Sequence, residues 1–221
     1  MDVLEAMRGR KSTRAYLDKP VARATVEAIL DAARWAPSGV NIQPWQVAVV
    51  TGATKERIGT DMLAARKAKQ PENPDYTYYP AQWEEPYKSR RKASGLALYA
   101  ALNIGKDDVF ARLKAWNNNY RFFGAPVGLL FFVDRTLAQG AWVDMGMFIE
   151  NVMLAARGHG LDTCPQASLA EYPDIVRGIL NIPATRALVC GMALGYADAS
   201  APVNGYRTER EPVGAFMSWH E

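Results

Sequence analysis

The chain contains little cysteine and no long hydrophobic run. Its only two cysteines, Cys164 and Cys190, are far apart and lie in apolar surroundings, which favours buried free thiols over a disulfide. No run approaches the roughly 18 apolar residues of a transmembrane helix, and the N-terminal residues lack the order of a signal peptide. We therefore expect a cytoplasmic protein without membrane contact.

Excess charge and familiar catalytic motifs are also absent. A net charge of +3 gives little support to nucleic-acid binding, and the aromatic residues lie apart from the basic clusters. Neither of the two histidines, His159 and His220, has a cysteine or acidic neighbour in a metal or nucleophile pattern. There is no nucleophile elbow, Walker loop or dinucleotide-binding glycine turn. We expect no metal site and no catalytic side chain, so that a cofactor provides the chemistry.

The most distinctive segment that is present is residues 36–45, between an amphipathic helix pattern and a β-branched run. Pro37 ends the helix pattern, and Pro44 limits the segment at its other end. The rigid loop presents three hydrogen-bonding side chains near Trp45, namely Ser38, Asn41 and Gln43. Such loops commonly hold planar polar ligands.

Basic residues gather in two places. Residues 10–14 hold three cations and two hydroxyls, a set that can surround a phosphate with charge-assisted hydrogen bonds. Arg207 and Arg210 form a second basic group near the C-terminus. A solvated basic turn is the alternative for the first cluster, and the sequence does not show whether the two groups converge.

Hydrophobic periodicity predicts a mixed α and β protein, with a central sheet covered by helices. The predicted strands span residues 46–51, 127–133 and 187–194. The predicted helices span residues 2–9, 25–36, 54–69, 93–102, 107–116, 142–157 and 173–181. The small, proline-bearing stretch 162–168 is interpreted as a polar segment that could lie flat against a planar ring.

Three further segments bear on the organisation of the chain. The helix 142–157 is apolar on nearly all sides, which predicts burial all round and favours a subunit interface. Residues 70–92 interleave prolines with aromatic residues, and we interpret them as a lid or an arm on a partner subunit, with an aromatic packing loop as the alternative. Residues 196–221 form a C-terminal arm. No domain boundary is evident, so one domain spans residues 1–221.

Six motifs, taken in order over nearly the whole chain, resemble the nitroreductase family of FMN-dependent flavoenzymes, and in particular its nitrobenzoate- and nitroaromatic-reducing branch. The motifs are Arg10-Lys11-Ser12-Thr13-Arg14-Ala15-Tyr16, Ala36-Pro37-Ser38-Gly39-Val40-Asn41-Ile42-Gln43-Pro44-Trp45, Gly124-Ala125-Pro126, Gly160-Leu161-Asp162-Thr163-Cys164-Pro165-Gln166, Gly191-Met192-Ala193-Leu194-Gly195-Tyr196 and Arg207-Thr208-Glu209-Arg210-Glu211-Pro212. No single motif is decisive, but the ordered set is highly specific.

The resemblance implies an α+β sandwich with a central, mostly antiparallel sheet flanked by helices, assembled as an intertwined homodimer with FMN at the subunit interface. One subunit would bind FMN through Arg10, Lys11, Ser12, Arg14, Asn118, Arg121, Pro165, Gln166, Ala167, Arg207 and Arg210. The opposite subunit would contribute Pro37, Ser38, Asn41 and Gln43. The helix that begins near Trp142 would form the core of the dimer.

The implied activity is reduction of nitroaromatic or quinone-type substrates by NADH or NADPH, in a ping-pong hydride transfer through FMN. Trp83 and Tyr87 are the hypothetical substrate lid. The alternatives are reductive dehalogenation, oxygen-dependent flavin fragmentation, and a flavin sensor without turnover. Trp83 and Gln43 replace acidic residues that are typical of the dehalogenating relatives, and this argues against the first alternative. The sequence does not identify the physiological substrate or the preferred nicotinamide cofactor.

Overall fold

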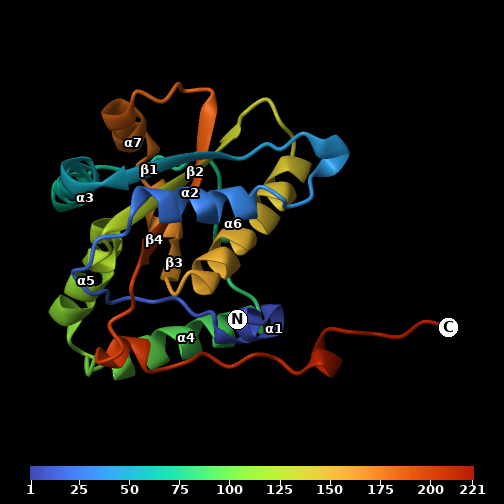
Figure 1. Cartoon of the computed structure of the whole chain (residues 1–221). Helices are drawn as coiled ribbons and strands as arrows, with labels where there is room; N and C mark the ends of the chain where they lie inside the picture. Colours follow the sequence, from blue (N-terminus) through green and yellow to red (C-terminus); the bar gives the residue numbers. More distant parts are fainter.

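A computed structural model describes residues 1–221, and its four strands form one antiparallel sheet in the order β1-β2-β4-β3 (Figure 1). The strands are β1 (Gln46–Thr51), β2 (Val127–Asp134), β3 (Asp162–Gln166) and β4 (Arg186–Gly195). The helices are α1 (Val3–Gly9), α2 (Arg23–Ala33), α3 (Gly52–Lys67), α4 (Tyr87–Ala101), α5 (Val109–Asn117), α6 (Gly140–Gly158) and α7 (Pro173–Leu180). This architecture is the α+β sandwich with an antiparallel sheet that the sequence predicted.

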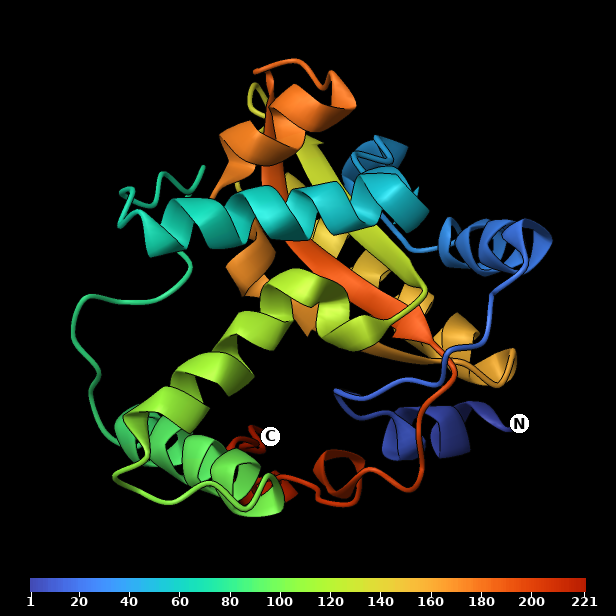
Figure 2. The same ribbon diagram turned by 90° about the vertical axis from the view of Figure 1, so that its left-hand side faces the viewer.

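The central strand β2 is apolar from Val127 to Val133 because both faces of the sheet are covered there. Leu129 and Phe131 point into a core formed with α2 and α6. Leu130 and Phe132, which alternate with them, point into a second core with α3 and α7. Side chains alternate between the faces of a strand, so a continuous apolar run is expected where helices cover both sides. Figure 2 shows α3 lying across one face of the sheet.

The 3₁₀ segment η2 (Asn118–Gly124) lies between α5 and β2, close to helix α3. Tyr120 and Phe122 are fully buried and anchor this segment in the second core. A Cβ atom at Gly59 of α3 would come within 2.4 Å of the backbone oxygen of Tyr120. Glycine at position 59 therefore permits the close contact that positions η2.

Two segments differ from their predicted structure. Residues 162–166 form the edge strand β3, which pairs only with β4, and not an irregular polar segment. Helix α4 begins at Tyr87, so the last six residues of the segment 70–92 are helical. Pro165 occupies an edge strand, where its missing N–H breaks no central ladder, and this proline hid the strand in the sequence.

Helix α6 packs against α2 and the sheet, but it is not buried all round within this chain. Val143 is 66% exposed, whereas Met145 and Phe148 are in the core. No other element of the single chain covers the Val143 side of α6, so its burial on all sides would require a partner subunit and stays a prediction. No helix is both long enough and apolar enough to span a membrane.

The C-terminal segment runs past helix α4, while the two termini themselves lie apart (Figure 1). Figure 1 shows the C-terminal residues passing along α4 and then extending away from the sheet. Arg90 of α4 forms an ion pair of 2.9 Å with Glu211 of this C-terminal segment. Residues 207–221 are exposed along their whole length.

Candidate functional site

A small polar cavity of about 140 Å³ joins the two basic groups of the sequence. Four cationic side chains and no acidic ones line it, so its charge suits a phosphate. The cationic residues are Arg10, Lys11, Arg14 and Arg210, and the others are Ser12, Ser94, Tyr206 and Thr208. The convergence that the sequence left open is therefore present in the structure.

Asn204 fixes the basic segment in place. Its Oδ1 accepts a hydrogen bond from the backbone N of Arg14 at 2.8 Å, and its Nδ2 donates to the carbonyl of Ala15 at 2.8 Å. Lys11 Nζ donates to the backbone carbonyl of Asn204. Ser12 also forms a parallel bridge with Thr163 of β3. Asn204 is only 3% exposed, so these bonds are protected from water.

Arg14 connects the small cavity to a larger one of about 450 Å³, because it lines both. Its Nη1 donates to the hydroxyl of Tyr206 at 3.0 Å, and its Cζ lies 6.0 Å from the centre of the Phe123 ring. Burial raises the pKa of Tyr206. The shared arginine places the two cavities next to each other, so together they form a candidate site for an elongated ligand with an anionic end.

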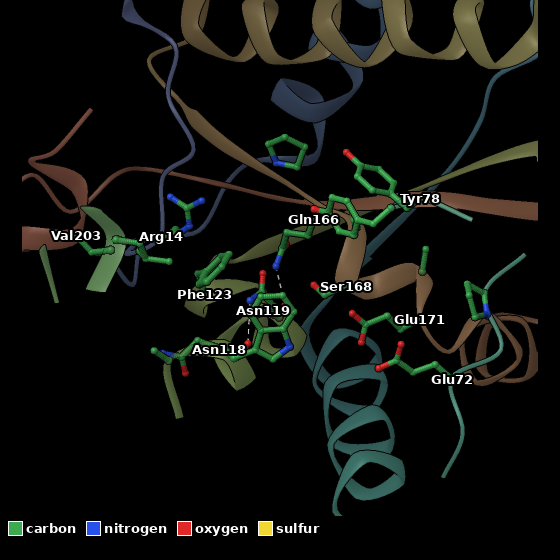
Figure 3. A pocket seen from close by; sticks show the side chains of 18 of the residues that line it. Arg14, Glu72, Tyr78, Asn118, Asn119, Phe123, Gln166, Ser168, Glu171 and Val203 are labelled. Atoms are coloured by element: carbon green, nitrogen blue, oxygen red, sulfur yellow. Dashed lines mark hydrogen bonds between the residues drawn. The ribbon is translucent and has the colours of Figure 1, made fainter. Parts of the chain in front are cut away.

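The larger cavity has aromatic walls and a polar edge (Figure 3). Aromatic side chains come from residues 76–79, from α4, from α5 and from η2, and they are Tyr76, Tyr78, Tyr79, Tyr99, Trp116 and Phe123. The same cavity is also lined by Asn118, Pro165, Gln166 and Ala167. A cavity of this kind suits planar rings that carry a few polar atoms.

Gln166 lines the larger cavity with one unsatisfied polar atom. Its Nε2 donates to the carbonyl of Asn119 at 2.7 Å, which fixes the orientation of the amide. Its Oε1 has no hydrogen-bond partner, although the residue is only 2% exposed. Buried polar atoms are normally paired, so this acceptor is available to a ligand donor in the cavity.

The far end of the larger cavity is acidic. Glu72 and Glu171 line it, and Arg66 Nη1 lies 3.6 Å from Glu72 Oε1 and 3.4 Å from Glu171 Oε2. The hydroxyl of Tyr120 donates to Glu171 Oε2. Burial raises the pKa of the Glu171 carboxyl, and the nearby charge of Glu72 adds to this rise, while Tyr120 and Arg66 oppose it.

The structure brings most of the predicted one-subunit residues to these two cavities. They are Arg10, Lys11, Ser12, Arg14, Asn118, Pro165, Gln166, Ala167 and Arg210. Arg207 lies outside them, and its Nη2 donates to the carbonyl of Arg10 at 3.1 Å. Arg121 is exposed and also lies outside both cavities.

Trp83 and Tyr87 do not line either cavity in this chain. Trp83 packs against Tyr79, with ring centres 5.6 Å apart, and Tyr79 is the residue that faces the cavity. Tyr87 is exposed in the first turn of α4. Within one chain, residues 76–79 occupy the covering position expected of a lid.

Pro37, Ser38, Asn41 and Gln43 also lie outside both cavities. Their loop sits on α6, where the backbone N of Gly39 donates to Asp144 Oδ2 at 3.2 Å. The backbone N of Gln43 donates to Ser38 Oγ at 3.0 Å, so the serine hydroxyl stabilises the loop itself. Within one chain, this loop therefore contributes to neither cavity.

Some of the residues that line the two cavities were not predicted from the sequence. Ser94, Tyr206 and Thr208 line the smaller, cationic cavity only because the C-terminal segment passes along α4. Glu72 and Glu171 are almost a hundred positions apart and meet through Arg66. The acidic pair is apparent only in the tertiary structure.

Comparison with known proteins identifies the family. A model of the Nitroreductase family matches residues 7–196 of this chain. The chain belongs to the nitroreductase family. The 4-nitrobenzoate reductase of Nocardioides sp. (strain LMS-CY) is 42% identical over 216 residues, which cover 96% of this chain and 87% of that protein. The nitrobenzene nitroreductase of Ectopseudomonas oleovorans is 41% identical and covers 98% of this chain and 96% of that protein.

Solved structures of the nitroreductase family have the same fold. The crystal structure of the FMN- and NADPH-dependent nitroreductase NfnB from Sphigopyxis sp. strain HMH superposes with a TM-score of 0.96 at 40% identity. The match covers all of both chains. The resemblance found in the sequence motifs is thereby confirmed for the family and the fold.

Proposed function

We propose that this nitroreductase-family protein is an FMN-dependent oxidoreductase that uses NAD(P)H to reduce nitroaromatic or quinone-type substrates. The observation that carries most weight is the cationic cavity joined by Arg14 to an aromatic cavity. Relatives of about 40% identity over the full chain are named as nitroreductases, and one is named as FMN- and NADPH-dependent. These relatives support the reductase over dehalogenation, flavin fragmentation and sensing without turnover.

The residues present fit FMN. Arg10, Lys11 and Arg210 would hold its phosphate with charge-assisted bonds, together with the hydroxyls of Ser12 and Thr208. Pro165, Gln166 and Ala167 would line its ring system, and the unpaired Gln166 Oε1 offers an acceptor to a ring N–H. Arg14 and Asn118 would contact the ring edge.

The chemistry that FMN supplies when bound is hydride acceptance from NAD(P)H, followed by reduction of the second substrate in ping-pong order. The chain provides orientation and electrostatics. Arg14 places a positive charge where the two cavities meet, and this charge stabilises negative charge that develops there. The aromatic walls provide flat apolar surfaces against which one planar substrate at a time can stack.

The proposed activity is tested by purifying the protein with added FMN and following NADH and NADPH oxidation with nitrobenzene and a benzoquinone. We expect a yellow protein and substrate-dependent nicotinamide oxidation. A colourless protein that takes up no FMN contradicts the proposal. A yellow protein that oxidises neither nicotinamide cofactor with any substrate favours a sensor.

We infer further that the protein is a homodimer in which Pro37, Ser38, Asn41 and Gln43 contact the FMN bound by the opposite subunit. Two features of the chain support this. Val40, in the same loop, is 96% exposed, and α6 leaves Val143 uncovered next to that loop's contact at Asp144. Exposed apolar side chains that cluster on one region commonly mark an interface. Residues 70–92 would cover the site as a lid or dimer arm, and residues 196–221 would pack on the partner as an arm of the single domain.

The homodimer is tested by light scattering during size-exclusion chromatography, with the bound FMN quantified across the peak. Val143→Glu is expected to give monomers that lose FMN, whereas the exposed change Arg23→Glu, on α2, leaves the dimer and its FMN intact. A stable monomer with full FMN content contradicts the inference. The cytoplasmic location expected from the sequence is a further proposal, tested by cell fractionation.

A further inference from the structure

The two ends of the larger cavity have opposite charge. Arg14 lies at one end, next to the smaller cationic cavity. Glu72 and Glu171 lie at the other end (Figure 3). The aromatic residues lie between them. A ligand in this cavity is therefore exposed to an electrostatic gradient along its length.

At the acidic end, two carboxylates line the cavity, whereas the arginine that pairs with them does not. Arg66 contacts both Glu72 and Glu171, but it does not line the cavity. Its Cζ instead lies 4.9 Å from the centre of the Tyr120 ring. One guanidinium and two carboxylates leave a formal charge of −1 when both acids are ionised, and this charge faces the space a ligand would occupy.

A second feature of this end indicates a ligand contact. Ser168 is 6% exposed, and its Oγ has no hydrogen-bond partner. The residue begins the turn that leads to Glu171, whose backbone N donates to the Ser168 carbonyl at 3.2 Å. Figure 3 shows Ser168 between Asn119 and Glu171, with its hydroxyl directed toward the Asn119 side of the cavity that all three residues line. Buried hydroxyls are normally paired, so a ligand group here would complete the bonding of Ser168.

We propose that Glu72, Glu171 and Ser168 form a charge-selective subsite for the ring substituent of the nitroaromatic substrate. The subsite accepts neutral, hydrogen-bonding or cationic substituents and rejects a carboxylate. The inference rests on the proposed function and names its substrate class as uncharged or ammonium-bearing nitroarenes rather than nitrobenzoates. At an effective dielectric constant of about 20, two like charges about 6 Å apart change an affinity by about a hundredfold, and screening reduces this toward tenfold.

Three substrates of one shape test this subsite: 4-nitrobenzyl alcohol, 4-nitrobenzylammonium and 4-nitrobenzoate. Each is titrated into the oxidised FMN-loaded protein, and Kd is read from the change in visible absorbance. The kcat/KM of each is then measured with NADPH. The variants are Glu72→Gln, Glu171→Gln, their double variant and Ser168→Ala, with the exposed Glu27→Gln of α2 as the matched control.

We expect the unchanged protein to bind the alcohol and the ammonium compound at least about tenfold more tightly than the carboxylate. The double variant is expected to remove most of this ratio, while Glu27→Gln leaves it as it was. Ser168→Ala is expected to weaken binding of the alcohol by about threefold to tenfold without changing the preference against the carboxylate. The single glutamine variants give the same comparison if the double variant does not fold.

Equal affinities for the alcohol and the carboxylate in the unchanged protein would overturn the proposal. A charge preference that the glutamine variants leave intact would overturn it as well. Because the Kd values need no turnover, they test the subsite independently of the activity. A failure of both NADPH and NADH to reduce the bound flavin would instead contradict the proposed function.

Discussion

Asn204 Oδ1 accepts a hydrogen bond from the backbone N of Arg14, 2.8 Å away and 190 positions earlier in the chain. This single contact fixes the arginine that lines both cavities. The same asparagine donates to the carbonyls of Ala15 and Asp198, so its side chain joins the basic segment to the start of the C-terminal arm. The geometry of the site thus depends on a residue that lines neither cavity.

Asn204→Ala is expected to weaken FMN binding and lower the free energy of unfolding by about 1–3 kcal/mol, because it leaves buried partners without their hydrogen bonds. Fluorescence titration with FMN and urea unfolding of the FMN-free protein measure the two effects separately. Gln82→Ala, at an exposed position, is the control. Unchanged FMN affinity in Asn204→Ala would show that Arg14 keeps its position without Asn204.

Arg210→Gln is expected to weaken FMN binding by about tenfold to a hundredfold, because a charge-assisted bond to the phosphate is lost. Riboflavin has the same ring system without the phosphate, so its affinity should not change. Arg23→Gln, an exposed arginine on α2, should affect neither ligand. Equal losses for FMN and riboflavin would mean that Arg210 does not contact the phosphate.

Gly59→Ala is expected to destabilise the protein by about 1–3 kcal/mol, because its Cβ would meet the Tyr120 carbonyl at 2.4 Å. Gly95→Ala in α4 is the matched control, since nothing lies within 4 Å of the added atom. Alanine is the better helix former, so the control should be neutral or stabilising by up to about 1 kcal/mol. Thermal and urea unfolding report both variants, and equal stabilities would contradict the close contact between α3 and η2.

The pH dependence of stability is expected to include a contribution from Glu171, whose pKa burial raises in the folded chain. An unfolded glutamate titrates near about pH 4.3. The protonated folded form is favoured, so the stabilisation is fully present below that pH and is lost as the pH rises through the folded pKa. The stability of the unchanged protein relative to Glu171→Gln should therefore fall as the pH rises from about 4.3 through the folded pKa. A difference that stays constant or increases over this range would contradict a raised pKa.

Sequence patterns predicted much of the fold where local and tertiary preferences agree. Residues 127–133 have an apolar side chain at nearly every position, and β2 has helices on both faces. Residues 46–51 and 187–194 were likewise predicted as strands and are confirmed as β1 and β4. The family resemblance pointed to nine residues that the structure gathers around the two cavities, and seven of them lie within the quoted motifs.

The remaining features depend on contacts between distant segments. Strand β3 was missed because Pro165 and small polar residues weaken its local signal, while pairing with β4 stabilises it. Asn204 contacts Arg14 only after the chain returns past α4, so its role is not visible from its neighbours in the sequence. Trp83 and Tyr87 line neither cavity of the single chain, whereas Tyr79 does, and their role as a substrate lid stays a prediction.

The central claim is that this nitroreductase-family protein passes electrons from NAD(P)H to a nitroarene through bound FMN. The most direct measurement mixes the FMN-loaded protein with NADPH, or with NADH, under anaerobic conditions, and then adds nitrobenzene. We predict that the visible absorbance of the flavin is lost in the first step and returns in the second, with each step independent of the other reactant. Flavin that stays oxidised with both nicotinamide cofactors, or reduced flavin that nitrobenzene does not reoxidise, would contradict the account.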